Sequence, residues 1–164
     1  MPKEKMKKLL YELMKNSRRS DRELAKVVNV SQPTITRARK EFENLGFIKE
    51  YTIIPEFTMI GFEIMAFTSM NINSSNESGR KITDYVENSP EILYGAPGTG
   101  MGDKNYFMAS LHSNFTEFNE FISRFKEKWA TNILSIETFL VSLKSRQMKH
   151  LSFKRVEEMF QEES

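Results

Sequence analysis

The chain has 164 residues, enough for one ordinary domain or two small ones and too few for a large catalytic barrel. It is 39% hydrophobic and 28% charged, which predicts a folded globule rather than a disordered chain. It contains no cysteine and only two histidines, which excludes disulfide scaffolds and thiol catalysis and disfavours a metal centre. There is no membrane-length apolar run and no signal peptide, so we expect a cytoplasmic protein without membrane contact, metal or cofactor.

The charge is distributed unevenly along the chain. Residues 1–54 carry 13 Lys and Arg against 7 Asp and Glu, a net charge of +6. Residues 55–164 carry 11 against 15, a net charge of −4. A basic unit followed by a mildly acidic one is typical of a protein whose first part binds a polyanion, although a solvated Lys-rich surface has the same composition.

The first 30 residues predict two helices. Apolar side chains recur at helical spacing over residues 3–15. Ser20 and Glu23 have the spacing of a capping box, which starts a short second helix. Asn29 is suited to the left-handed position that ends this helix.

A third helix is predicted almost immediately afterwards. Ser31 is its N-cap, Pro33 lies in its first turn and Gly46 ends it. Its buried side is expected to consist of Ile35, Ala38, Phe42 and Leu45. Two helices joined by so short a turn form a helix-turn-helix, whose second helix enters the DNA major groove.

The outward face of this third helix has the side chains that contact bases and phosphates. Two β-prone runs, residues 47–49 and 51–54, follow it and predict a hairpin wing. The predicted DNA-binding residues are Ser31, Gln32, Thr34, Thr36, Arg37, Arg39, Lys40 and Lys49.

These residues resemble the Lrp/AsnC family of transcriptional regulators. The resemblance covers about residues 3–62 and rests on Glu23-Leu24-Ala25, Val30-Ser31, the run from Arg37 through Leu45-Gly46-Phe47-Ile48-Lys49-Glu50-Tyr51-Thr52, Pro55 and Ile60-Gly61-Phe62. Arg39 departs from the family pattern, which usually has an aliphatic residue there. We interpret Arg39 as extending outward to an additional phosphate; the alternative is a slightly rotated helix.

The remaining chain predicts an independent α+β unit at 63–144, after a linker at 55–62. Strands are expected at 63–73, 92–94, 106–112 and 133–143, with helices at 74–88 and from Asn114 onward. The order βαββαβ is that of a ferredoxin-like domain, so the fold class is α+β, a winged helix-turn-helix followed by a ferredoxin-like domain. The resemblance implies the same domain, as the family's effector-binding and oligomerisation unit.

One sheet face of such a domain carries no helix. Phe107, Ala109 and Leu111 are expected on the helix-covered side. The uncovered face would then include Tyr106, Met108, Ser110 and His112, or else Met65 and Phe67, depending on strand direction. A second copy of the chain is the simplest cover for an apolar face, so we expect a homodimer or larger homo-oligomer that reads palindromic double-stranded DNA.

The Gly-rich turn at 98–103 has two interpretations. It is either a plain hairpin turn or, as the resemblance implies, a site for a small-molecule effector such as an amino acid. The matching residues are Gly100, Gly102, Asp103 and Asn105, with Asn105 where the family commonly has Asp. The loop from Gly95 to Gly102 is longer than the family's norm.

Residues 145–164 form a tail with a short helix expected from Ser152. This tail could dock on its own domain, pack on a partner subunit or fray. The predicted function is sequence-specific transcription regulation, not catalysis. Two alternatives stay open: an enzyme resembling the sirohaem decarboxylases, which share this architecture, and a metabolite sensor that does not bind DNA.

Overall fold

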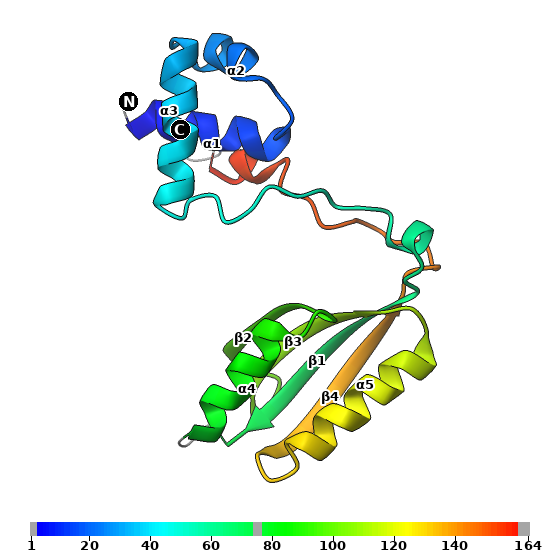
Figure 1. Ribbon diagram of the computed structural model, residues 1–164. Coiled ribbons are helices and arrows are strands. Elements are labelled where there is room, and N and C mark those ends of the chain that lie inside the picture. The colour runs from blue at the N-terminus through cyan, green and yellow to red at the C-terminus, as the bar shows by residue number, and fades with distance from the viewer. Residues whose placement is uncertain (1–2, 74–76, 161–164) are drawn as a thin grey trace. The chain divides into compact units, whose positions relative to one another are not determined.

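The computed structural model describes residues 3–73 and 77–160 (Figure 1). The chain divides into two compact units, one formed by residues 3–54 with 149–160 and the other by residues 55–148. Each unit has its own hydrophobic core. In the described parts of the chain, no helix combines the length and apolar composition needed to cross a bilayer.

The first unit is built on α1 (Lys3–Lys15), α2 (Asp21–Val28) and α3 (Gln32–Asn44). The capping box predicted at Ser20 and Glu23 is present, and Asn29 is left-handed with φ 56°. The apolar faces of the three helices meet in one core of Leu9, Leu13, Leu24, Ala25, Val28, Ile35, Ala38 and Phe42. Leu45, expected in this core, is exposed because α3 ends one residue earlier.

The predicted hairpin wing does not form as two paired strands within the described residues. The amide groups of Phe47 and Ile48 both donate to the Phe42 carbonyl, at 2.8 and 3.2 Å, so they close the end of α3 instead. The Phe47 ring packs edge-on against Phe42, with centroids 5.8 Å apart. Residues 51–54 pair with no strand in the described parts of the chain.

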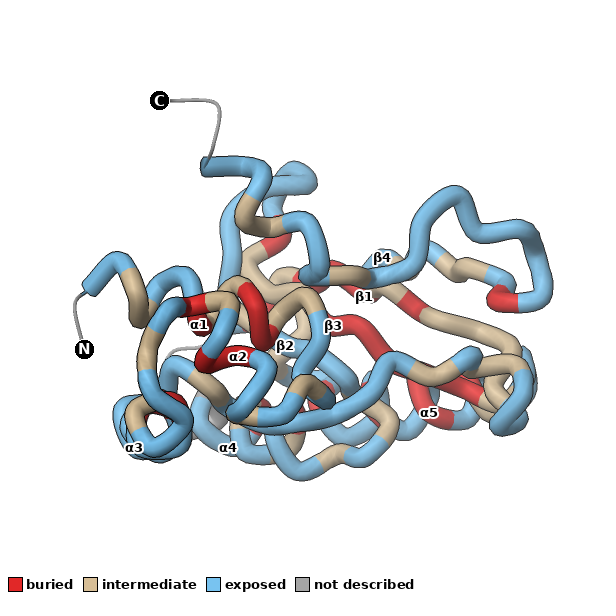
Figure 2. The backbone as a smooth tube through the Cα atoms, turned by 90° about the horizontal axis from the view of Figure 1, so that it is seen from above, coloured by how far each residue is buried: buried red, intermediate tan, exposed pale blue. Residues whose placement is uncertain are grey.

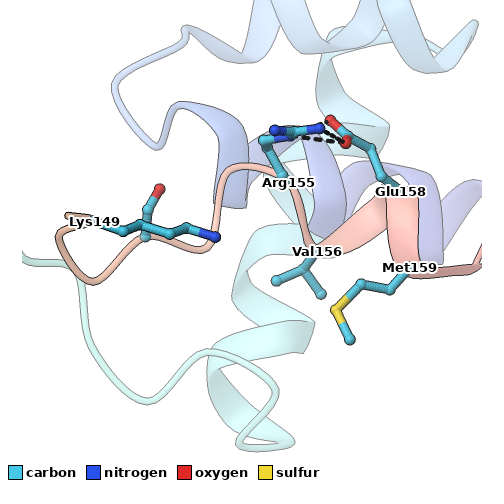
Figure 3. Close-up of a pocket in the computed structure, with 6 residues that line it drawn as sticks. Lys149, Arg155, Val156, Glu158 and Met159 are labelled. Carbon is cyan, nitrogen blue, oxygen red and sulfur yellow. Dashed lines mark hydrogen bonds and ion pairs between the residues drawn. The ribbon is translucent and has the colours of Figure 1, made fainter.

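The C-terminal tail belongs to the first unit. Its helical part is a 3-10 turn, η2 (Val156–Phe160), rather than an α-helix. The Phe160 ring stacks on Tyr11 of α1 at 6.3 Å, and Glu157 pairs with Lys15. Arg155 pairs with Glu158 beside a small surface cavity (Figure 3). In the structure the tail therefore packs on α1 of the first unit.

The second unit is a four-stranded antiparallel sheet with strand order β2-β3-β1-β4. Its elements are η1 (Phe57–Ile60), β1 (Ile64–Ile72), α4 (Glu77–Asn88), β2 (Ile92–Gly100), β3 (Lys104–His112), α5 (Phe115–Lys128) and β4 (Ile133–Ser142). The order βαββαβ confirms the ferredoxin-like topology. The start of the helix predicted at 74 lies outside the described residues.

Both helices pack on one face of this sheet, over Ala66, Met70, Ile72 and Met108 (Figures 1 and 2). The helix side of the core comes from Ile82, Val86, Phe118, Phe121, Ile122, Phe125 and Trp129. Helical spacing after Asn114 predicts an apolar stripe of Phe115, Phe118, Ile122, Phe125 and Trp129. In the structure Phe121 is buried in this stripe, whereas Phe115 is exposed. Asn114 caps α5 as predicted, accepting from the Glu117 amide at 2.9 Å.

The prediction that Phe107, Ala109 and Leu111 of β3 lie on the helix-covered side of the sheet was wrong. Met108 and His112 face the helices, and the His112 ring lies 5.4 and 5.0 Å from those of Phe118 and Phe121. The uncovered face therefore has the other alternation, with Phe67 stacked on Phe107 at 6.2 Å. Alternation alone identifies two faces but not which one the helices cover.

The Gly-rich turn is shorter than predicted. β2 continues to Gly100 and β3 begins at Lys104, so only residues 101–103 connect them. Met101 and Gly102 both have positive φ values, 47° and 73°. Of the two, glycine adopts such a value without strain. Gly95 and Gly98, expected in a long loop, lie within β2 because β3 pairs with it.

Candidate nucleic-acid interface

The candidate interface is the exposed side of α3. Ser31 caps this helix by accepting from the Thr34 amide, and Pro33 lies in the first turn. The reverse side is anchored by Ile35, Ala38 and Phe42, which are all buried. Because this side packs in the core, the opposite side of α3 faces away from it.

Five residues line a shallow hollow along this exposed side: Gln32, Pro33, Thr36, Arg37 and Lys40. Arg37 and Lys40 make no ion pair with any described residue, and both are exposed. An Arg guanidinium can form a bidentate contact with guanine, and a Lys ammonium suits phosphate. The two cations are thus available to a polyanion.

The other predicted contacts fall into different classes. The hydroxyl groups of Ser31 and Thr34 lie 2.7 Å apart and serve the helix cap. Thr36 donates to a carboxylate oxygen of Asp21 at 2.6 Å. Lys49 is exposed, beyond α3, on a segment without strand structure.

Arg39 does not extend outward as interpreted from the sequence; its side chain folds back onto Asp21 and the Arg19 carbonyl. Its Nε lies 2.7 Å from Asp21 Oδ1, as an ion pair rather than a well-directed hydrogen bond, and its Nη2 donates to the Arg19 carbonyl at 2.8 Å. Asp21 is the first residue of α2 and lies 15 positions before Thr36 in the sequence. Local spacing could not reveal it as a partner for two residues of α3.

A second ion-pair cluster stabilises the turn between α1 and α2. Glu12 is 7% exposed and pairs with Lys15 at 2.8 Å and with Arg19. Burial acts to raise the pKa of Glu12, but the bonds and charges of Lys15 and Arg19 outweigh it and lower that pKa. These cations are therefore partly neutralised within the protein and contribute less to DNA attraction than Arg37 and Lys40, which pair with no described residue.

The predicted effector residues are only partly available. Both polar atoms of the Asn105 amide bond the backbone of Ile72: Nδ2 donates to its carbonyl and Oδ1 accepts from its N–H, each at 2.8 Å. Asn105 therefore ties the end of β1 to β3 instead of facing a ligand. Gly100 and Gly102 shape the turn through their positive φ values.

Asp103 is the remaining candidate at this turn. Its carboxylate accepts from Lys104, Asn71 and Ser135 at 2.8, 3.0 and 2.9 Å, and these bonds hold its pKa far below the ordinary range. Its side chain is 56% exposed and pairs with Lys104, so this carboxylate is held in a fixed position at one end of the sheet. Among the described residues, no three His, Cys, Asp or Glu side chains come together to hold a metal ion.

Comparison with known proteins agrees with the geometry. Residues 3–49 match a family described as winged helix-turn-helix DNA-binding, the class that the first unit defines. The chain is 30% identical to an uncharacterized HTH-type transcriptional regulator of Pyrococcus abyssi over 132 residues, 79% of this chain and 85% of that protein. The chain belongs to the Lrp/AsnC family of transcriptional regulators.

Two solved structures share the fold over 92% of this chain. An AsnC family transcriptional regulator from Agrobacterium tumefaciens has a TM-score of 0.75 at 20% identity, with 94% of its chain covered. The Neisseria meningitidis regulator NMB0573 in complex with L-Met has a TM-score of 0.74 at 19% identity, with 93% covered.

Proposed function

We propose that this regulator binds duplex DNA sequence-specifically through α3, with Arg37 as the base-reading cation and Lys40 as a phosphate contact. The observation that carries the proposal is that both cations are exposed, unpaired among the described residues and on one side of a helix whose other side is packed. The net +6 of residues 1–54 supports attraction to a polyanion.

The test begins with selection of bound fragments from a random DNA pool and continues with charge-removing variants. Arg37→Ala should cost about 1–3 kcal/mol on the selected site and relax sequence preference. Lys40→Ala should weaken all sequences alike and reduce the salt slope by about one unit. Lys126→Ala removes an exposed cation from α5 and is the matched control. If both α3 variants bind as wild type does, α3 is not the DNA-contacting helix.

Dimerisation on the uncovered sheet face is the second part of the proposal. Phe139 is 72% exposed and lies opposite Phe67 in the sheet register, and Phe67 stacks on Phe107. An apolar face of this kind is better covered by a second copy than by water. Phe139→Glu should shift the full chain toward monomer in light scattering, whereas Phe115→Glu, at an exposed Phe of α5, should not. A monomeric wild type would remove this part of the proposal.

A small-molecule effector is the third part, with Asp103 as its candidate anchor. The L-Met complex of the Neisseria protein supports an amino acid as the ligand class, because a fixed carboxylate suits an ammonium group. Calorimetry with the amino acids on wild type and Asp103→Ala tests it; equal binding by both proteins would exclude Asp103. The enzyme alternative gains no support from His112, which is enclosed by α5 and bonded to Ser110 at 2.8 Å.

A further inference from the structure

Asp21 joins the two helices of the helix-turn-helix through both of its carboxylate oxygens. Oδ2 accepts from the Thr36 hydroxyl at 2.6 Å, and Oδ1 pairs with the Arg39 guanidinium at 2.7 Å. Thr36 and Arg39 are three apart on α3 and therefore lie on neighbouring positions of its surface. One residue at the start of α2 thus holds α3 at two points.

The hydrophobic core alone does not determine the rotation of α3 about its own axis precisely enough to aim a side chain at a base. The buried contacts Ile35, Ala38 and Phe42 set which side faces inward, but apolar contacts are non-directional. Hydrogen bonds are directional, so the bond from Thr36 to Asp21, backed by the Arg39 ion pair, defines the angle from which Arg37 approaches a base. Thr36 serves this contact and is thereby removed from direct base reading.

The contact also places a carboxylate beside the DNA-facing surface. Thr36 lines the same hollow as Arg37 and Lys40, and Asp21 is bonded to it. A bare carboxylate there would repel phosphates, but Arg39 neutralises it within a largely enclosed pair: the two side chains are 22% and 18% exposed.

We propose that Asp21 is a specificity-determining positioning residue, which orients α3 through Thr36 and Arg39, and that Arg39 prevents its charge from opposing DNA. This inference rests on the proposed DNA binding through α3. If the contact between Asp21 and Arg39 had only a structural role, losing either residue would change DNA affinity in the same direction. Losing Asp21 removes a negative charge near DNA, whereas losing Arg39 exposes one.

The experiment compares Asp21→Asn with Arg39→Leu in the full chain, on the selected duplex and on a scrambled duplex, over a range of salt. Asp21→Asn should bind the scrambled duplex more tightly than wild type and lower the ratio of selected to scrambled affinity. Arg39→Leu should bind both duplexes more weakly. Each change of one charge should alter the salt slope by up to about 0.9, which is about a threefold difference in affinity over a fourfold range of salt.

Two further variants make the test specific. Glu4→Gln removes a carboxylate from the first turn of α1 and should leave the affinity ratio unchanged. Thr36→Val should lower the ratio without changing the salt slope, and the double variant Asp21→Asn with Thr36→Val should lose no more discrimination than Asp21→Asn alone, because Thr36 acts through Asp21. Thermal melts of every variant confirm that the compared proteins are folded.

The outcomes distinguish this inference from the proposed function. Opposite shifts in scrambled-duplex affinity support it. Shifts of Asp21→Asn and Arg39→Leu in the same direction, or additive losses in the double variant, would overturn it while DNA binding by wild type stands. No binding of any duplex by wild type would overturn both.

Discussion

The Asn105 amide bonds both the N–H and the carbonyl of Ile72. Replacing Asn105 by Asp removes the Nδ2 donor and places a carboxylate oxygen against the Ile72 carbonyl. Ile72 is 2% exposed, so its C=O has no ready access to water. An unsatisfied buried backbone group costs about 1–3 kcal/mol, whereas the bond from the Ile72 N–H to the remaining oxygen is kept. We therefore expect Asn105→Asp to destabilise the second unit by about 1–3 kcal/mol at neutral pH.

The measurement is urea unfolding of the full chain followed by tryptophan fluorescence. The sequence contains a single Trp, Trp129, which is buried in the core of the second unit and so reports on that unit. The new carboxyl should have its pKa raised by the adjacent carbonyl. The stability deficit should therefore be full above that raised pKa and shrink as pH falls through it towards the ordinary Asp value of about 3.9, because a protonated carboxyl can again donate.

A matched control is Asn119→Asp, the same change on the exposed side of α5. If Asn105→Asp unfolds at the same urea concentration as this control and wild type, the two bonds to Ile72 do not stabilise the sheet. If its deficit is as large at pH 4 as at pH 7, the reasoning about the lost donor is wrong.

Three further predictions concern stability. Burial lowers the pKa of His112, so the second unit should lose stability as pH falls below about 6.5, and His112→Gln should flatten that loss in the same fluorescence assay. Ser31→Ala should cost the first unit about 1 kcal/mol through the lost N-cap, seen as faster hydrogen exchange in α3. Phe160→Ala removes the stack on Tyr11 and should lower the melting temperature of the first unit by about 2–12 °C, because an aromatic pair contributes about 0.5–1.5 kcal/mol. If the pH dependence, the hydrogen exchange or the melting temperature is the same in the variant as in wild type, the corresponding contact does not stabilise the protein.

Short-range signals in the sequence were sufficient for the helices of the first unit. The capping box at Ser20, the left-handed Asn29 and the N-cap at Ser31 all depend on residues within three or four positions of one another. The order of strands and helices in the second unit was predictable for the same reason, since periodicity is a local property. These features, with the resemblance they carry, were enough for the class of regulator.

Long-range partners decided the rest. Arg39 faces inward because Asp21 lies opposite it, 18 positions earlier in the sequence. Asn105 is a structural residue because the sheet brings Ile72 within hydrogen-bonding distance, and β3 presents Met108 to the helices because of the side on which α4 and α5 pack. Spacing along the chain determines which side chains share a face, but a side chain's role depends on what the fold places against that face, and those neighbours come from distant parts of the sequence.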